Sequence, residues 1–100
     1  MAEPNREGLF RDRTPAAAAQ QLAIVLVWLA ECELATYERL ETIKRSSKHQ
    51  LGRHKEIGDK VIEQLADLNV PADTRGLFGR PCPRVRERLT DIYARRGKRA

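Results

Sequence analysis

The sequence contains few aromatic residues, and this shortage limits how its core can be built. Five of its 100 residues are aromatic, so the hydrophobic core must consist mainly of Leu, Ile, Val and Ala. Runs of alternating β-branched residues are also absent, whereas Ala, Leu, Glu, Arg and Gln are common, which favours helix over strand. Because a chain this short buries only about two-thirds of the surface that its unfolded form exposes, we expect one small domain.

Cysteine is equally scarce. The two cysteines, Cys32 and Cys82, are too few for a disulfide scaffold, and one lies in a strongly helical segment while the other lies between two prolines. Disulfide-poor chains of this size are typical of reducing compartments. We therefore expect a soluble, cytoplasmic protein.

Motifs for metal binding and for catalysis are missing as well. The spacing of His49 and His54 relative to the two cysteines matches no closed zinc pattern. The sequence shows no nucleophile with a base, no paired carboxylates and no glycine-rich loop of the kind that holds phosphate. We expect no metal, no cofactor and no enzymatic activity.

Three helical segments can be delimited from their end signals. Thr14 is a good N-cap and Pro15 a good first helical residue, Asn69 followed by Pro71 marks a helix end, and Pro83 suits the start of another helix. The prediction is an all-α fold, in which a long antiparallel helical hairpin is joined by a shorter third helix, with helices over about 15–46, 48–69 and 83–96. Residues 1–13 are expected to be a flexible N-terminal arm, and residues 14–100 a single helical domain with a basic C-terminal tail. The alternative is one unbroken helix over residues 15–68, which would reach about 80 Å.

The first helix includes nine consecutive apolar residues, Leu22 to Ala30. An amphipathic surface helix needs a polar face, and this run offers none, so two short helices should leave one side of it uncovered. Exposed apolar patches of this kind mark interfaces. We expect a homo-oligomer, with a dimer favoured, or an obligate protein partner. The predicted association surface consists of Ile24, Val25, Val27 and Trp28.

The same apolar run is also compatible with a compact monomer or with a membrane helix. Leu9 and Phe10 of the arm could fold over the open side and complete a three-helix core. A membrane helix is less well supported, because Ala16 to Ala30 is only fifteen residues and includes two glutamines, short of the roughly twenty that a span requires. We expect no membrane association.

Positive charge is concentrated in two blocks. Of a net charge of +5, residues 44–60 contribute +4 and residues 75–100 contribute +7, with acidic blocks between. Clustered Lys and Arg attract phosphate, although such runs are more often solvated surface, and Glu87 and Asp91 can pair with the arginines of the third helix. The candidate phosphate contacts are Lys44, Arg45, Lys48, Arg53 and Lys55 at the hairpin tip, and Arg84, Arg88 and Arg95 on the third helix.

The connection before the third helix is a further candidate site. Arg75, Phe78 and Arg80 lie in a glycine- and proline-containing stretch, and loops of this length are often functional. They form a candidate binding loop, unless Leu77 and Phe78 plug the open end of the bundle, which is the interpretation we favour.

These observations favour a small interaction or regulatory protein that self-associates through its apolar first helix. The alternative is a nucleic-acid-binding accessory protein that holds phosphates with the basic hairpin tip and the C-terminal tail.

Overall fold

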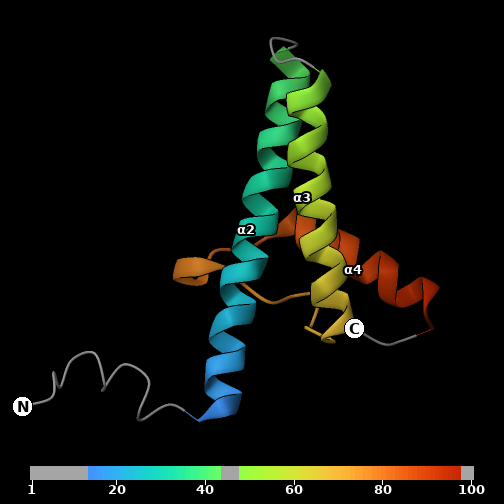
Figure 1. Cartoon of the computed structure of the whole chain (residues 1–100). Coiled ribbons are helices and arrows are strands. Elements are labelled where there is room, and N and C mark those ends of the chain that lie inside the picture. The colour runs from blue at the N-terminus through green and yellow to red at the C-terminus, as the bar shows by residue number, and fades with distance from the viewer. Residues whose placement is uncertain (1–13, 44–47, 98–100) are drawn as a thin grey trace, which may run out of the picture.

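A computed structural model describes residues 14–43 and 48–97 of the chain. They form the helices α2 (Pro15–Ile43), α3 (Lys48–Asp67) and α4 (Pro83–Arg95), with a short 3₁₀ helix, η1 (Leu77–Gly79), before α4. α2 and α3 run side by side in opposite directions, and α4 lies across the hairpin near its open end (Figure 1). The predicted all-α hairpin with a shorter third helix is confirmed.

The helices end where the sequence places their signals. The hydroxyl of Thr14 accepts a hydrogen bond from the N–H of Ala17 at 3.1 Å, as an N-cap does. Asn69 has a left-handed φ of 58°, and the N–H of Val70 bonds back to the carbonyl of Leu65, which is the Schellman arrangement at a helix end. Pro83 is the first residue of α4. Local chemistry therefore fixes the start of α2, the end of α3 and the start of α4.

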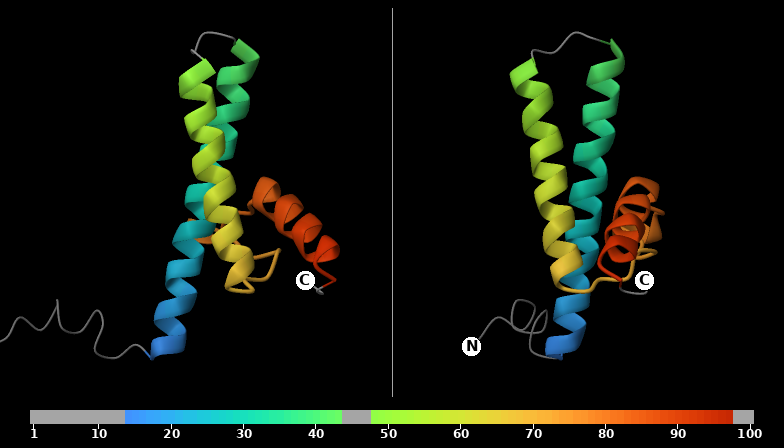
Figure 2. Two further views of the ribbon diagram at one scale, coloured as in Figure 1. Left: turned by 45° about the vertical axis from the view of Figure 1, so that its right-hand side comes forward. Right: turned by 90° about the vertical axis from the view of Figure 1, so that its right-hand side faces the viewer.

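The hairpin rules out one continuous helix, since both further views show α2 and α3 packed against each other (Figure 2). α2 is described as far as Ile43, so its predicted end near residue 46 is outside the described residues, and α3 ends at Asp67 rather than at residue 69. The arm over 1–13, the turn near residues 46 and 47, and the last residues of the basic tail lie outside the described residues.

The core lies where all three helices meet. α2 contributes Val27, Ala30 and Leu34; α3 contributes Val61, Ile62, Leu65 and Ala66; α4 contributes Val85, Leu89 and Tyr93. The expectation that Val27 belongs to an association surface is wrong, because Val27 is 0% exposed within a single chain. Whatever surface α2 offers to a partner is made by other residues.

Gly58 lets α3 approach α2 closely. A Cβ atom placed on Gly58 would lie 2.8 Å from Cδ2 of Leu34, which is itself 2% exposed and has little room to move. A Cβ atom placed on Gly52, earlier in the same helix, would meet no atom of another part of the chain within 4 Å. The two glycines therefore share a helix but differ in the space around them.

This difference predicts opposite effects for the same substitution. Gly52→Ala should raise the free energy of unfolding by up to about 1 kcal/mol, because alanine is the better helix former. Gly58→Ala should lower it by about 1–2 kcal/mol, since overpacking a core costs about 1–3 kcal/mol and outweighs that gain. Urea denaturation at one fixed protein concentration measures both. If Gly58→Ala is as stable as Gly52→Ala, the close packing of Leu34 against Gly58 is incorrect.

Candidate association surface

A buried carboxylate joins α2 to the beginning of α4. Glu31 is 6% exposed, and its Oε1 accepts a hydrogen bond from the N–H of Val85 at 3.0 Å. Cys82, the N-cap residue of α4, supplies no side-chain cap, so Glu31 of another helix takes that role. A negative charge at a helix N-terminus is favourable for the helix dipole. The contact fixes one side of α2 against α4.

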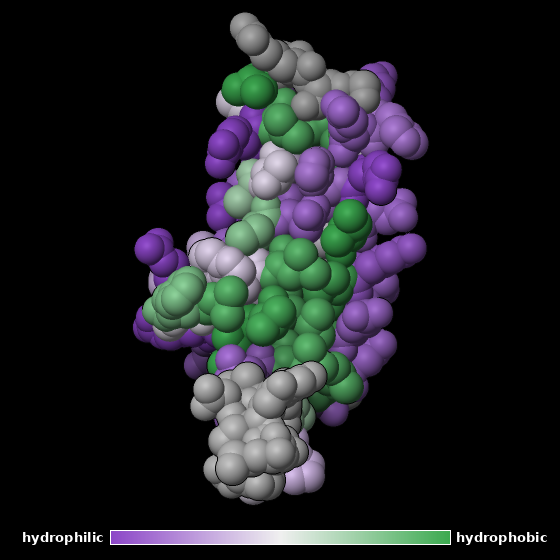
Figure 3. All heavy atoms as spheres, turned by 60° about the vertical axis from the view of Figure 1, so that its left-hand side comes forward, coloured by the Kyte–Doolittle hydropathy of each residue, from purple (hydrophilic) through white to green (hydrophobic). Residues whose placement is uncertain are grey.

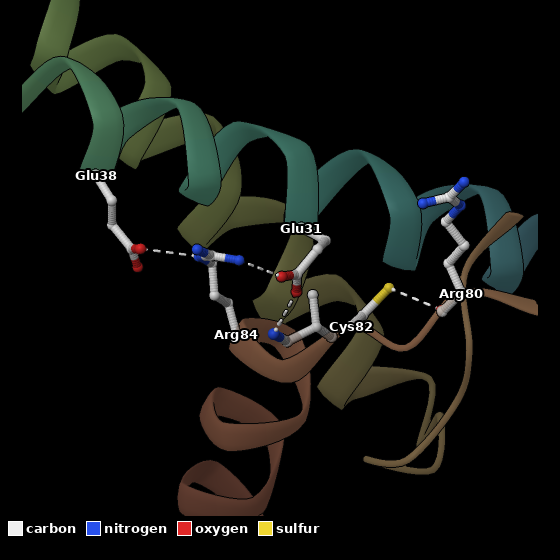
Figure 4. A network of polar contacts seen from close by, with 6 residues as sticks. Glu31, Glu38, Arg80, Cys82 and Arg84 are labelled. Carbon is white, nitrogen blue, oxygen red and sulfur yellow. Dashed lines mark hydrogen bonds and ion pairs between the residues drawn. The ribbon is translucent and has the colours of Figure 1, made fainter.

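Arg84 completes this contact. It donates to Glu31 at 2.8 Å and to Glu38 at 2.9 Å, so one guanidinium bridges two carboxylates spaced two turns apart on α2 (Figure 4). The hydrogen bonds that Arg84 donates to Glu31 and, second in effect, to Glu38 raise its pKa above the usual value. Sequence patterns do not indicate this network, because the partners are 46 and 53 residues apart.

A second side of α2 is fixed by the chain before α4. A Cβ on Gly76 would lie 2.6 Å from Cε3 of Trp28 and 2.9 Å from Sγ of Cys82. Only a glycine leaves room for the indole ring to pack against the backbone here. Trp28 is consequently half-buried inside its own chain. Only the part of its side chain that remains exposed can belong to the predicted association surface, at the edge of that surface.

The side of α2 opposite these contacts is apolar and uncovered. Leu22 is 56% exposed, and Val25 and Leu29 are each 41% exposed. Their spacing of three and four residues places them on one line along the helix, and we call these three residues the outer stripe. Ile57 of α3 and Leu68, the residue directly after α3, are also exposed. They are eleven residues apart, which is about three turns, so they share one side of the hairpin.

Together these five side chains form what we call the apolar face. Hydrophobic residues gather in one patch over the lower half of α2 and the neighbouring part of α3, on the side turned away from α4 (Figure 3). Of the predicted surface residues, Val25 lies in this face, Ile24 is half-buried, and Val27 is in the core. Leu22 and Leu29 were missed, although the heptad spacing that links them to Val25 is visible in the sequence.

Most of the predicted phosphate contacts on the described residues already have acidic partners. Arg88 binds Asp59 of α3, Arg95 lies 3.5 Å from Asp91, and Lys55 lies 3.8 Å from the same Asp59. Arg84 bridges Glu31 and Glu38. Lys48 and Arg53 are exposed at the start of α3, while Lys44 and Arg45 lie outside the described residues. Helix α4 therefore presents a largely neutralised surface rather than an open row of arginines.

The candidate binding loop does expose its aromatic residue. Phe78 is 93% exposed at a left-handed φ of 61°, so the prediction that it plugs the bundle is wrong. Leu77 is half-buried. Arg75 donates to the carbonyl of Gly79 at 3.1 Å and thereby braces η1, and Arg80 is exposed. The three predicted residues thus lie on or beside one short, projecting turn.

One of the two histidines of α3, His54, has a structural partner. Nδ1 of His54 lies 2.7 Å from a carboxylate oxygen of Glu33, which joins α3 to α2. Within residues 14–43 and 48–97, no group of three His, Cys, Asp or Glu side chains is arranged to hold a metal ion.

By length and composition alone, α2 is long and apolar enough to cross a membrane, and 22% of its most apolar 18-residue window is buried. The argument that the segment is too short therefore does not hold. One such helix is weak evidence for a membrane, because core helices and signal sequences share these properties.

Comparison with protein-family models, with curated proteins and with solved structures found no match. The geometry of the chain is therefore the basis for assigning it a function.

The Glu31 contact predicts unequal effects for two similar substitutions. Glu31→Gln should lower the free energy of unfolding by about 2 kcal/mol, because it removes the charge of a nearly buried carboxylate that binds both Arg84 and the N–H of Val85. Glu38→Gln should cost less than about 1 kcal/mol, because Glu38 is half-exposed and solvent screens its interaction. Chemical denaturation measures both values. Equal losses for the two variants would contradict the role given to Glu31.

The two thiols should react at very different rates. Cys32 is exposed, whereas Cys82 is 5% exposed and burial, followed by the nearby charge of Glu31, raises the pKa of its thiol. Since the thiolate is the reactive form, a disulfide reagent at neutral pH should modify one thiol per folded chain quickly and the second only on unfolding. Cys32→Ser should abolish the fast phase. A fast phase that survives in this variant would show that Cys82 is accessible.

Proposed function

We propose that this chain is a small interaction protein that self-associates, as a homodimer, through the apolar face formed by α2 and α3. The observation that supports the proposal most strongly is the outer stripe. Leu22, Val25 and Leu29 remain substantially exposed after α3, α4 and η1 have packed against the other sides of α2.

The composition around the stripe supports the same function. Thr14 to Ala30 is a stretch of 17 residues without a charged side chain, and its only polar side chains are those of Thr14, Gln20 and Gln21. Contiguous exposed apolar surface of this kind is uncommon in monomers and typical of interfaces. Ile57 of α3 and Leu68 just beyond it widen the stripe into a face that a helix from another subunit can cover.

A rough balance of free energies indicates a weak rather than a permanent dimer. Five apolar side chains per subunit are roughly half exposed, and covering the exposed half of each is worth about 1 kcal/mol. Ten such side chains contribute about 10 kcal/mol, of which association itself consumes at least about 4 kcal/mol. The remainder, at most about 6 kcal/mol, corresponds to a dissociation constant no tighter than about 40 μM.

Nucleic-acid binding, the alternative from the sequence, has less support. The arginines of α4 that would hold phosphates are bound by Glu31, Glu38, Asp59 and Asp91. A phosphate would have to displace these carboxylates, which removes most of the gain from the new contact. We therefore retain self-association as the proposed function.

Val25→Glu should weaken the dimer at least about 30-fold, since each interface would then bury two carboxylates without partners. The matched control is Gln20→Glu, which adds the same charge to the same exposed end of α2 but on the side of the helix away from the outer stripe. Sedimentation velocity over a range of concentrations measures both, and circular dichroism verifies that both remain helical.

If Val25→Glu and Gln20→Glu behave alike, the outer stripe is not the interface and the proposal fails. The same conclusion follows if the unmodified chain and Val25→Glu are both monomeric at the highest concentration tested.

A further inference from the structure

The exposed line on α2 extends beyond the outer stripe with a regular spacing. Ala18, Leu22, Val25, Leu29 and Cys32 are all exposed, and they follow one another at intervals of four, three, four and three residues. This heptad spacing is the one by which two helices pack along a common seam. The seam has no partner within residues 14–43 and 48–97 of the same chain, which leaves it open to the α2 helix of a second copy.

Charge along α2 determines which direction a second copy can take. The helix is uncharged up to Ala30, whereas residues 31–43 hold four glutamates and one arginine, and remain acidic even with Arg84 counted. A parallel pair in register would place one acidic half beside the other, where like charges repel. An antiparallel pair places uncharged half against uncharged half.

The shape of the hairpin favours the same direction. Residues 14–22 are all exposed, and the first turns of α2 extend past the end of α3 in every view (Figures 1 and 2). In an antiparallel pair, these projecting turns lie along the outer stripe of the other copy, at the level of its α3. In a parallel pair they would contact only each other.

We infer that two copies of this chain pair their α2 helices in antiparallel orientation, with Ala18 of each copy opposite Leu29 of the other and Leu22 opposite Val25. This inference rests on the proposed self-association and specifies its geometry. At each end of the paired segment this register places the small side chain of Ala18 against the large one of Leu29, as interdigitated packing requires. It also pairs Thr14–Ala30 with residues 17–33 of the second copy, so the uncharged segments overlap almost completely.

Disulfide trapping tests the register directly. In a Cys32→Ser background, with the buried Cys82 retained, three variants are compared: Ala18→Cys, Leu29→Cys and the double variant. Diamide oxidises each facing pair of thiols to a disulfide and is itself reduced to the hydrazine. Residues 18 and 29 are about 16 Å apart along one helix, too far for a bond within one chain.

In the antiparallel register, the double variant should form covalent dimers at least about 10-fold faster than either single variant. Mixing the two single variants should give a covalent heterodimer joined between residues 18 and 29, identified by peptide mass. This mixture keeps one of the two Ala18–Leu29 pairings fully native, and each chain has only one new cysteine, so it remains informative if the double variant folds poorly. The unmodified chain should cross-link slowly, because Cys32 of one copy then faces residue 15 of the other.

The opposite pattern overturns the inference. Rapid homodimers of each single variant, or of the unmodified chain through Cys32, would show a parallel pair; self-association would stand while the antiparallel geometry would fail. A monomeric wild type that shows no cross-linking above that of an unfolded control would refute both. A wild type that is monomeric in solution but binds phosphatidylcholine vesicles would show that a lipid surface, rather than a second copy, covers this face.

Discussion

The hydrogen-bonded carboxylate of Glu31 determines which side of α2 faces inward. From Thr14 to Ala30 the helix has no charged residue, so hydrophobic periodicity by itself does not fix its rotation. Glu31 does so by capping α4 through Val85 and by binding Arg84. Val27, one turn earlier on the same side, is consequently buried, and Val25 is turned outward. The exposed apolar face is a result of this single orientation.

Glycine at two positions makes the same orientation sterically acceptable. Gly58 admits Leu34 from one side of α2, and Gly76 admits Trp28 from another. With α3, α4 and η1 each placed against α2, three sides of the helix are occupied and no further element of the described chain remains to cover the fourth. The proposed dimer is inferred from this uncovered fourth side of α2 and not from any recognised motif.

The sequence predicted those parts of the fold that depend on local chemistry. The caps at Thr14, Asn69 and Pro83 defined helix ends because each depends on residues within a few positions of it. The exposure of Val25 could also be anticipated, since a wholly apolar run exceeds what two short helices can cover.

The rotation of α2 and the role of its ion pairs could not be predicted, because they depend on residues distant in sequence. Val27 was assigned to the surface since no polar face distinguished it from Val25. Arg84 and Arg88 were predicted to contact phosphate, whereas in the structure they bind carboxylates that belong to α2 and α3. Phe78 was expected to fill the bundle, but its left-handed backbone conformation turns it outward.

The most direct test of the proposed dimer is the mass of the unmodified chain in solution. Sedimentation equilibrium from about 1 to 500 μM brackets a dissociation constant of about 40 μM. We predict that the apparent mass rises with concentration from 11.4 kDa toward twice that value and then levels off. A constant mass of 11.4 kDa over the whole range would show that the apolar face is not an interface between copies, and would contradict the proposal.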